Sequence, residues 1–289
     1  MSQETTSISA ATRLYGVVGR PIGHSLSPVL HSFWMHDHDI DAAYVALPMR
    51  GVPDHLVIDR LRAAGDLGFG GLNITAPFKE AALAAADKAD PTAQAIGAAN
   101  VLDFRDETIF AANTDANGFI AALDEGAPNW RKTAPCAVLF GAGGAAMAVA
   151  FALAQAGVER ILIVNRSFYR AARLAAATPR AEAIFWDHRT AAIAQADLLI
   201  NALSGPDAVA AALAHGLPPG DGQKIAMDLT YRPLETVFLA AARAQNWVCV
   251  DGLGMLVHQA AAAFQIWFGL RPDAKAGRRR ALARLATAA

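Results

Sequence analysis

Short apolar runs alternate with amphipathic segments of helical length along almost the whole chain. Up to residue 115, the runs predicted as strands are 13–19, 42–49, 69–75, 98–104 and 109–115. The segments predicted as helices between them are 27–40, 52–65 and 78–90. Strands separated by helices of this length need crossover connections, which produce a largely parallel sheet. The alternation therefore predicts an α/β fold for this part of the chain.

The same alternation resumes beyond residue 136. The runs predicted as strands there are 137–140, 160–166, 183–187, 198–203, 224–231 and 247–252. Helical segments separate most of them, so we expect a second α/β unit. The chain closes with two predicted helices, 254–269 and 278–287, with no strand between them. Two helices are too few to form a domain, so we expect them to pack onto the N-terminal part.

The composition disfavours nucleic acid and membrane surfaces as partners. The chain has 289 residues, of which 54% are hydrophobic and 18% charged, and its net charge is −1. This balance gives no electrostatic reason to expect nucleic acid or a membrane surface as partner. Cys136 and Cys249 both lie in apolar runs, which favours buried free thiols in a reducing compartment. No apolar signal segment opens the sequence and no run has transmembrane length, so we expect a cytoplasmic protein.

A glycine-rich turn follows the predicted strand 137–140 directly. Gly141, Gly143 and Ala146 match the G-x-G-x-x-G/A pattern, and a long helix begins there. The first glycine permits a tight turn, the second lets the backbone approach a pyrophosphate, and the helix N-terminus supplies N–H donors. An ordinary strand–helix turn is the alternative, and the strand–turn–helix context disfavours it. The residues predicted to bind the cofactor in this turn are Gly141, Ala142, Gly143, Gly144 and Ala145.

The end of the next predicted strand indicates which dinucleotide binds. NAD-binding units usually carry an acid there, which accepts a hydrogen bond from the ribose 2′-hydroxyl. This strand ends instead in Asn165, Arg166 and Ser167, and Arg170 follows. An acid would repel a 2′-phosphate, whereas two guanidinium groups can bind one through charge-assisted hydrogen bonds. The sequence therefore predicts NADP, with two solvated helix arginines as the alternative.

Polar side chains gather where the predicted strands of the N-terminal part stop. The residues are Ser25, Ser27, Asn73, Thr75, Lys79, Asn100, Asn113, Thr114 and Asp115. Ligands of open α/β sheets bind at the carboxyl ends of the strands, so this set predicts a small substrate rich in hydroxyl groups. Two hydroxyls near a helix N-terminus suit a carboxylate. A simple N-cap before Pro28 would account for Ser27 but not for Ser25 as well.

Taken together, these motifs resemble the shikimate dehydrogenase family, which reduces 3-dehydroshikimate with NADPH in aromatic amino acid biosynthesis. The resemblance runs from about Leu14 to Leu270, and the order and spacing of its motifs make it specific. The matching stretches are GRPIGHSLSPVLH, GLNITAPFKE, AIGAAN, NTDANGF, GAGGAA, NRS, DLTYRP and GLGMLVHQAAAAFQIWFG. It implies two α/β domains. One is a substrate domain with a mostly parallel sheet, residues 1–114 and 252–289, and the other is a Rossmann-like, doubly wound NADP domain, residues 115–251.

The resemblance also implies roles for single residues. Lys79 and Asp115 would form the catalytic pair. The substrate carboxylate would be held by Ser25, Ser27 and Tyr231. The ring hydroxyls would be bound by Asn73, Thr75, Asn100, Asp115 and Gln259. Gly252 and Met255 would lie beside the cofactor.

The chain departs from the family pattern at two places. Val101 stands where threonine is usual, and residues 201–204 read Asn-Ala-Leu-Ser where the family more often has Asn-Ala-Thr. Both departures bear on fine specificity. His31, His36 and His38 lie in one predicted helix, but no cysteines or carboxylates complete a zinc site at the usual spacing, so we predict no metal. For His24, a place in the substrate loop and a role in capping the turn both stay open.

Two alternatives to this function stay open. One is a quinate dehydrogenase of the same family that uses NAD or both cofactors. The other is a regulatory paralogue that binds the ligand without turning it over, and the presence of both Lys79 and Asp115 disfavours it. For partners, we expect a small-molecule substrate, no nucleic acid, no membrane, and a monomer or a homodimer.

Overall fold

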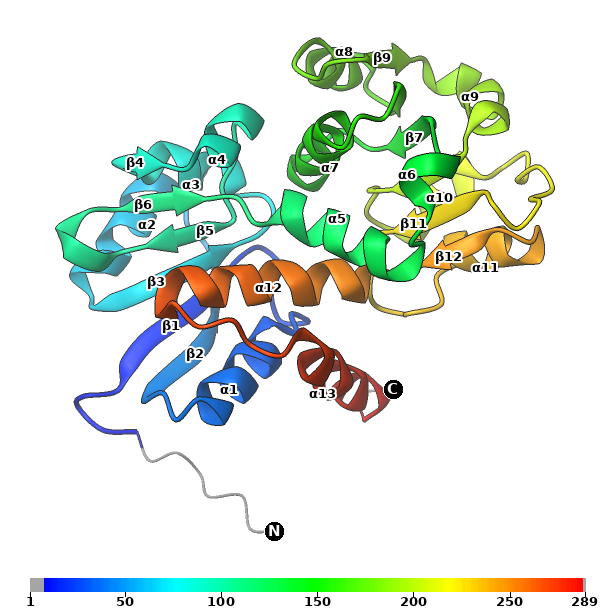
Figure 1. Ribbon diagram of the computed structural model, residues 1–289. Helices are drawn as coiled ribbons and strands as arrows, with labels where there is room; N and C mark the ends of the chain where they lie inside the picture. The colour runs from blue at the N-terminus through cyan, green and yellow to red at the C-terminus, as the bar shows by residue number, and fades with distance from the viewer. Residues whose placement is uncertain (1–7, 288–289) are drawn as a thin grey trace. The chain divides into compact units, whose positions relative to one another are not determined.

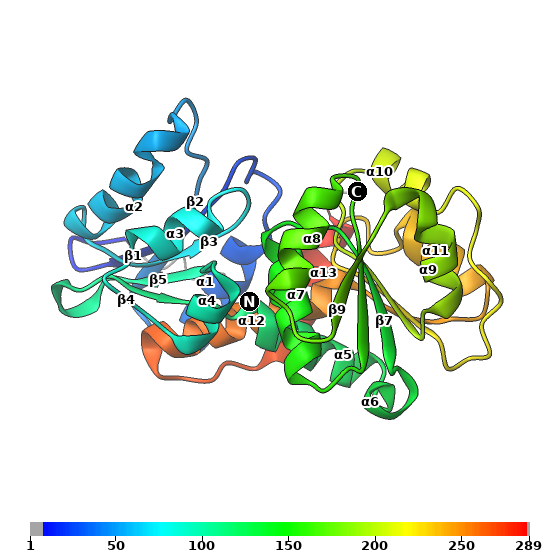
Figure 2. The same ribbon diagram turned by 90° about the horizontal axis from the view of Figure 1, so that it is seen from above.

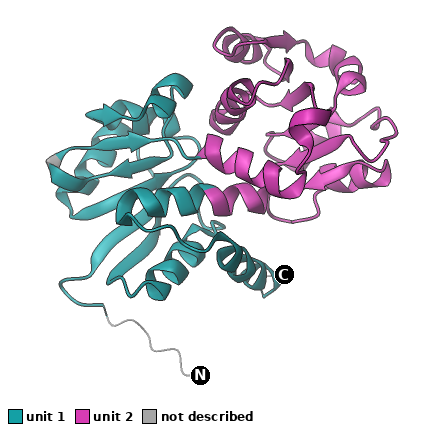
Figure 3. Ribbon diagram, viewed as in Figure 1, with its two compact units in different colours: residues 1–114, 259–289 teal, residues 115–258 magenta. Residues whose placement is uncertain are grey.

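The computed structural model describes residues 8–287 and is shown in Figure 1. The chain divides into two compact units, which Figure 3 distinguishes by colour. Unit 1 contains residues 1–114 and 259–289, and unit 2 contains residues 115–258. The first division falls where the sequence analysis placed a domain boundary. The second follows residue 258 rather than residue 251.

Unit 1 is built on a six-stranded sheet. Its strands are β1 (Arg13–Val18), β2 (Ala42–Leu47), β3 (Phe69–Ile74), β4 (Lys88–Ala89), β5 (Val101–Asp103) and β6 (Phe110–Ala112). Their order in the sheet is β2-β1-β3-β5-β6-β4. The pairs β1–β2, β1–β3 and β4–β6 are parallel, and β5 runs antiparallel to both of its neighbours. The prediction of a mostly parallel sheet is therefore confirmed, with β5 as the exception.

Helices cover both faces of this sheet. They are α1 (Ser27–Asp37), α2 (Val57–Asp66), α3 (Lys79–Ala85), α4 (Pro91–Ile96) and α13 (Ala274–Ala286), with short 3-10 turns η1 (Asp54–Leu56) and η2 (Arg105–Glu107). The helix α12 (Gly252–Phe268) begins in unit 2 and ends in unit 1. Figures 1 and 2 show α2 and α3 on one face of the sheet and the end of α12 on the other.

The C-terminal helices pack onto the N-terminal part, as the sequence predicts. The Trp34 indole N–H donates to the Asp273 carbonyl at 3.1 Å, just before α13 begins. A Cβ added to Gly277 of α13 would lie 2.4 Å from the Trp34 ring, so the glycine is what lets α13 approach α1. The end of α12 is held similarly, because the Trp267 indole N–H donates to the Leu102 carbonyl at 3.1 Å.

Unit 2 holds a second six-stranded sheet, which is entirely parallel. Its strands are β7 (Cys136–Phe140), β8 (Arg160–Val164), β9 (Ala181–Ile184), β10 (Leu198–Asn201), β11 (Ile225–Asp228) and β12 (Val248–Val250). Their order is β12-β11-β10-β7-β8-β9. This is the strand order of a doubly wound dinucleotide-binding sheet, whose order reverses between β7 and β10. The predicted fold class is confirmed.

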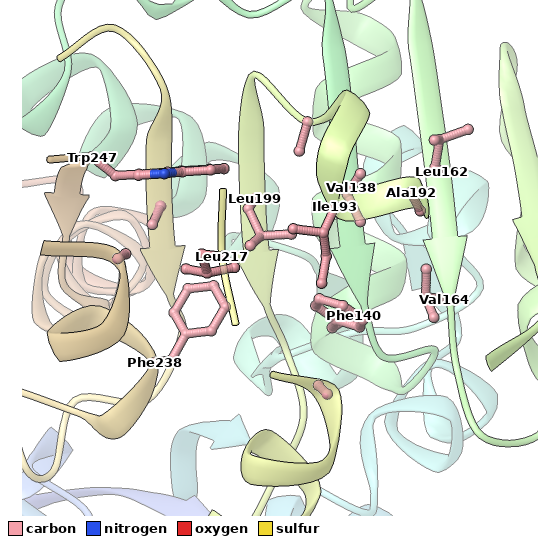
Figure 4. Close-up of a cluster of buried hydrophobic side chains, with 14 of the residues drawn as sticks. Val138, Phe140, Leu162, Val164, Ala192, Ile193, Leu199, Leu217, Phe238 and Trp247 are labelled. Carbon is pink, nitrogen blue, oxygen red and sulfur yellow. The ribbon is translucent and has the colours of Figure 1, made fainter. Parts of the chain in front are cut away.

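The helices of unit 2 lie on both faces of its sheet. They are α5 (Asp115–Gly126), α6 (Trp130–Thr133), α7 (Gly144–Gln155), α8 (Phe168–Ala176), α9 (Arg189–Gln195), α10 (Pro206–Ala212) and α11 (Val237–Ala244), with the 3-10 turn η3 (Trp186–His188). Figure 2 shows α7 and α8 on one face and α9 and α11 on the other. On the second face, Phe140, Leu199 and Phe238 belong to one buried apolar cluster (Figure 4).

Both cysteines are free thiols, as expected. Cys136 is buried, whereas Cys249 is only partly buried, so the prediction that both are buried is wrong for Cys249. Burial raises the pKa of each thiol. Residues 1–7, which carry part of the expectation that no signal segment is present, lie outside the described residues. Within residues 8–287, no helix is both long and apolar enough to cross a bilayer.

Candidate active site

One edge of the unit 1 sheet carries the polar side chains that the sequence analysis placed at strand ends. Asn73 is the second-to-last residue of β3, and Asn113 and Thr114 follow β6. Asn100 does not end a strand, as the sequence analysis assumed, but immediately precedes β5. Because β5 runs antiparallel, its beginning lies at the same edge as the ends of β3 and β6. Asn100 therefore reaches the predicted place for a different reason.

Hydrogen bonds join three of these residues to Gln259 of α12 in one group, here called the amide cluster (Asn73, Asn100, Thr114 and Gln259). The Asn73 Nδ2 donates to the Asn100 carbonyl at 3.3 Å, and the Asn100 Nδ2 donates to the Gln259 Oε1 at 3.1 Å. The Asn100 Nδ2 also lies 2.9 Å from the Thr114 Oγ1. The Thr114 N–H donates to the Asn100 Oδ1 at 2.8 Å, and its hydroxyl donates to the Gln259 carbonyl at 3.0 Å. Residues distant in the sequence thus form one hydrogen-bonded polar group.

Thr75 and Lys79 continue from β3 into α3. The Thr75 N–H donates to the Val18 carbonyl at 2.8 Å, which ties the turn to the neighbouring strand β1. Lys79 is the first residue of α3, and its carbonyl accepts from the Ala99 N–H at 2.9 Å. This bond holds the start of α3 beside the residue that precedes Asn100. The side chain of Lys79 is neither fully buried nor fully exposed.

Ser25 and Ser27 lie where the loop after β1 enters α1. The Ser25 Oγ accepts from the Ser27 N–H at 3.2 Å. The N-cap of α1 is Leu26, and no side chain caps the helix, so the N-cap interpretation of Ser27 is wrong. Ser27 is buried, and its side chain lies close to the Tyr44 phenol. His24 is exposed in the same loop.

Unit 2 carries Asp115 and Tyr231, and also Gly252 and Met255, which are predicted to lie beside the cofactor. Asp115 is the first residue of α5 and is buried. Tyr231 lies in the loop after β11, and Gly252 and Met255 form part of the first turn of α12. Met255 is buried, and a Cβ added to Gly252 would lie 2.4 Å from the Leu229 carbonyl oxygen. The backbone at Gly252 therefore leaves no room for a side chain.

The loop that carries Tyr231 is held by a buried carboxylate. Asp228, at the end of β11, accepts from the Asn201 Nδ2 at 2.9 Å, from the Thr230 N–H at 2.9 Å and from the Thr236 hydroxyl at 2.7 Å. Asn201 in turn accepts from the Leu203 N–H at 3.1 Å. The loops after β10 and β11 are thus fixed to each other. The 201–204 variation leaves Asn201 in this network.

The glycine turn has the geometry that a phosphate-binding loop needs. Gly141 has φ +111, and a Cβ there would lie 2.9 Å from the Ala202 carbonyl oxygen, so both conformation and space require glycine. Gly143 is the N-cap of α7, no side chain caps that helix, and an added Cβ at Gly143 would meet nothing within 4 Å. Backbone N–H groups at this helix end are the donors that a pyrophosphate takes. Gly144 and Ala145 open the first turn of α7, and Ala142 lies between the two glycines.

Two exposed arginines stand at the end of β8. Arg166 lies in the loop and Arg170 in the first turn of α8, and neither forms a salt bridge within residues 8–287. The Asn165 Nδ2 donates to the Ser167 carbonyl at 3.0 Å, which shapes the loop between them. Their exposure and their place beside the edge that carries the glycine turn fit recognition of a phosphate.

His31 and His38 differ in their surroundings. His38 is the C-cap of α1 rather than a residue inside it, and His31 is completely buried among aromatic rings. In the part of the chain that the structure describes, no group of three or more His, Cys, Asp or Glu side chains could hold a metal ion.

The chain is similar in sequence to known proteins along most of its length. The model of the shikimate dehydrogenase substrate binding domain matches residues 17–102, that of shikimate / quinate 5-dehydrogenase matches residues 130–230, and that of the shikimate 5'-dehydrogenase C-terminal domain matches residues 252–282. A relative from Paramagnetospirillum magneticum, named shikimate dehydrogenase (NADP(+)), is 44% identical over 92% of this chain and 96% of its own length. The chain belongs to the shikimate dehydrogenase family.

Solved structures of shikimate dehydrogenase relatives share the fold. The enzyme of Thermus thermophilus, solved with NADP(H) and shikimate, is 37% identical, with a TM-score of 0.79 over 94% of this chain and 99% of its own. A quinate dehydrogenase from Corynebacterium glutamicum, solved with NAD, is 31% identical, with a TM-score of 0.81 over 94% of this chain and 99% of its own. The predicted family membership is thereby confirmed.

Two residues of this shikimate dehydrogenase family member escaped the sequence analysis. Tyr44 in β2 donates a hydrogen bond to the Asn73 Oδ1 at 2.6 Å, and His31 stacks on the Tyr44 ring. The sequence pattern offers His31 only as a possible metal ligand and Tyr44 only as a strand residue. The apolar pattern of β2 shows that Tyr44 belongs to a strand, but no local pattern shows which polar group its hydroxyl meets.

Proposed function

We propose that this protein is an NADP-dependent shikimate dehydrogenase, which interconverts shikimate and 3-dehydroshikimate. Membership of the family and the naming of its relatives support the activity. The observation that carries the choice of substrate class is the amide cluster, since amide and hydroxyl groups fixed at one sheet edge suit a ring with several hydroxyls. The glycine turn and the exposed Arg166 and Arg170 support NADP.

The proposed roles follow the chemistry of alcohol oxidation. The alcohol loses a hydride from its ring carbon and a proton from its oxygen, and reduction of the ketone adds both back. NADP, when bound, accepts or supplies the hydride, so the residues of the chain must hold the ring and move the proton. Lys79 and Asp115 are proposed for the proton transfer, because a positioned acid–base group is what this step needs.

The remaining binding residues divide by the part of the substrate that they would contact. Ser25, Ser27 and Tyr231 are proposed for the carboxylate. The residues proposed for the ring hydroxyls are Asn73, Thr75, Asn100, Gln259 and, in addition to its catalytic role, Asp115. Gly252 and Met255 are proposed to lie beside the nicotinamide. The cytoplasmic location and the monomeric or homodimeric state stay predictions.

Initial rates with four substrate–cofactor pairs test the proposed function. Shikimate with NADP should give the highest kcat/KM, and quinate should be turned over about 10–100-fold less efficiently. Quinate carries an additional hydroxyl on the carbon that bears the carboxylate, and a buried hydroxyl without a partner costs about 1–3 kcal/mol. Equal or better turnover of quinate would establish the quinate dehydrogenase alternative. Binding without turnover of either acid would establish the regulatory alternative.

The choice of cofactor is tested by removing both exposed guanidinium groups. The wild type should favour NADP over NAD by at least about 10-fold in kcat/KM, which corresponds to about 1.4 kcal/mol. Arg166→Ala with Arg170→Ala should remove most of this preference and leave turnover with NAD almost unchanged. Arg173→Ala is the matched control, because Arg173 is an exposed arginine further along α8. A double variant that still prefers NADP as strongly would place phosphate recognition elsewhere.

A further inference from the structure

Tyr44 is a buried tyrosine whose hydroxyl touches the amide cluster. It is 6% exposed and lies on β2, which is an outermost strand of the unit 1 sheet and pairs with β1. Its hydroxyl donates to the Asn73 Oδ1 at 2.6 Å. Neither the sequence motifs nor the proposed mechanism assigns it a role. This buried phenol donates its only proton to a proposed substrate-binding residue, and such a contact calls for an explanation.

The hydrogen bonds of Asn73 can be satisfied in only one orientation of its amide. The nitrogen of Asn73 faces the Asn100 carbonyl, which can only accept, so the amide oxygen must be the atom that faces Tyr44. If the amide turned over, two carbonyl oxygens would face each other. The Tyr44 O–H therefore meets the oxygen and fixes the amide nitrogen on the side of the amide cluster.

The phenol of Tyr44 is a donor in this arrangement. Tyr44 has one proton, and the Asn73 Oδ1 accepts it. Burial raises the pKa of Tyr44 well above its usual value, with nearby Ser27 opposing that rise, so the phenol keeps its proton. The donors thus run in one direction, from Tyr44 through Asn73 to the Asn100 carbonyl.

Aromatic rings hold Tyr44 in place. The His31 ring stacks on the Tyr44 ring with centroids 4.4 Å apart and an interplanar angle of 2°. The Trp267 ring lies 6.3 Å from the Tyr44 ring and 5.3 Å from the His31 ring. These contacts leave the phenol little freedom to turn away, so its hydroxyl is a fixed donor.

We propose that Tyr44 is a positioning residue for substrate binding, which acts by orienting the Asn73 amide. With its oxygen bound to Tyr44, Asn73 presents an N–H group to the amide cluster side and so selects a substrate oxygen that accepts a hydrogen bond. A ring hydroxyl or a ketone can do this, whereas an ammonium group cannot. This inference rests on the proposed role of Asn73 in substrate binding.

Tyr44→Phe tests the inference, with Tyr15→Phe as a matched control. Tyr15 lies opposite Tyr44 on the adjacent strand, is also buried, and also packs on Trp267, but its hydroxyl makes no hydrogen bond within residues 8–287. Tyr44→Phe should raise the KM for shikimate about 10-fold, leave kcat within about threefold and leave the KM for NADP unchanged. Tyr15→Phe should leave all three unchanged. Equal effects of the two variants would overturn the inference.

A double-mutant cycle separates this inference from the proposed function. Once Asn73→Ala is in place, adding Tyr44→Phe should raise the KM for shikimate by less than about twofold, because the group that Tyr44 orients is gone. If the wild type does not turn over shikimate, the proposed function fails, and the cycle is then measured by the urea concentration at the midpoint of unfolding. Tyr44→Phe should lower this midpoint in the wild type but not in Asn73→Ala. Additive effects in both measurements would show that Tyr44 does not act through Asn73.

Discussion

Replacing Lys79 by alanine should lower kcat about 100-fold or more and change the affinity for shikimate by less than about tenfold. Lys79 opens α3, and a backbone hydrogen bond to Ala99 holds that point beside the amide cluster. A general acid–base group acts in the transition state, so its loss appears in kcat more than in ground-state binding. Steady-state kinetics and a binding titration measured on the same protein would show this separation.

Lys88→Ala is the matched control for Lys79→Ala. Lys88 is an exposed lysine of the same unit, on β4, and its removal should leave kcat unchanged. A purely structural role for Lys79 makes a different prediction, namely a lower free energy of unfolding with kcat per folded molecule preserved. Thermal unfolding of both variants therefore distinguishes the two roles. A normal kcat in Lys79→Ala would exclude it from the proton transfer.

Acid should destabilise the protein through His31. This side chain is 0% exposed, and burial lowers its pKa from 6.5 to about 3, with the nearby Asn73 side chain opposing the shift. Neither ring nitrogen reaches a partner at hydrogen-bonding geometry within residues 8–287, so that opposition is weak. The folded state therefore keeps His31 neutral at pH values where the unfolded chain is protonated. An imidazole that stays neutral can stack on Tyr44 without carrying a charge into the aromatic core.

The sign and size of this effect follow from proton linkage. Above pH 6.5 neither state is protonated at His31, so the residue adds no pH dependence. Between pH 6.5 and about 3 only the unfolded state binds the proton, and the free energy of unfolding falls by about 1.4 kcal/mol for each unit of pH. From pH 7 to pH 4.5, His31 should therefore account for a loss on the order of 2–3 kcal/mol.

His31→Phe isolates this loss from that of other titrating groups. The variant keeps a flat ring against Tyr44 but cannot bind a proton. Its urea-unfolding free energy should therefore fall less over this pH range, by roughly 2–3 kcal/mol. His36→Gln is the control, since His36 is an exposed histidine of the same helix and should keep the wild-type dependence. Identical pH dependence in the wild type and His31→Phe would contradict a neutral, buried His31.

The long periodic segments of this chain were predictable, and some of the short ones were not. The central strands β7 and β8 of unit 2 are almost continuous apolar runs, and the glycine turn after β7 has a sequence pattern of its own, so all of them are predictable from the sequence. The short helix α4 was not predicted. Its signals were present, because Asp90 caps it by accepting from the Ala93 N–H at 2.6 Å and Gly97 ends it in the left-handed conformation.

Strand direction and side-chain pairing lie beyond what local patterns contain. The apolar pattern of the three-residue strand β5 does not show in which direction the strand runs. Its antiparallel course, which brings Asn100 to the ends of β3 and β6, is seen only in the folded chain. The pairing of Tyr44 with Asn73 joins two strands that do not adjoin in the sheet. The family resemblance supplied proposed binding residues one by one, but the partner that orients one of them required the three-dimensional arrangement.

The division of unit 1 between both ends of the chain has a consequence for its synthesis on the ribosome. Residues 1–114 emerge first, but α13 packs on their helix α1, and Trp267 near the end of α12 packs on their sheet. An added Cβ at Gly71 would lie 2.2 Å from the Trp267 ring, so these two residues are in close contact. Gly71 and Trp34 therefore lack their packing partners from the C-terminal part while the whole of unit 2 is translated. Unit 2 is complete in sequence before unit 1 can close, so the domain that begins the chain is the one that finishes folding last.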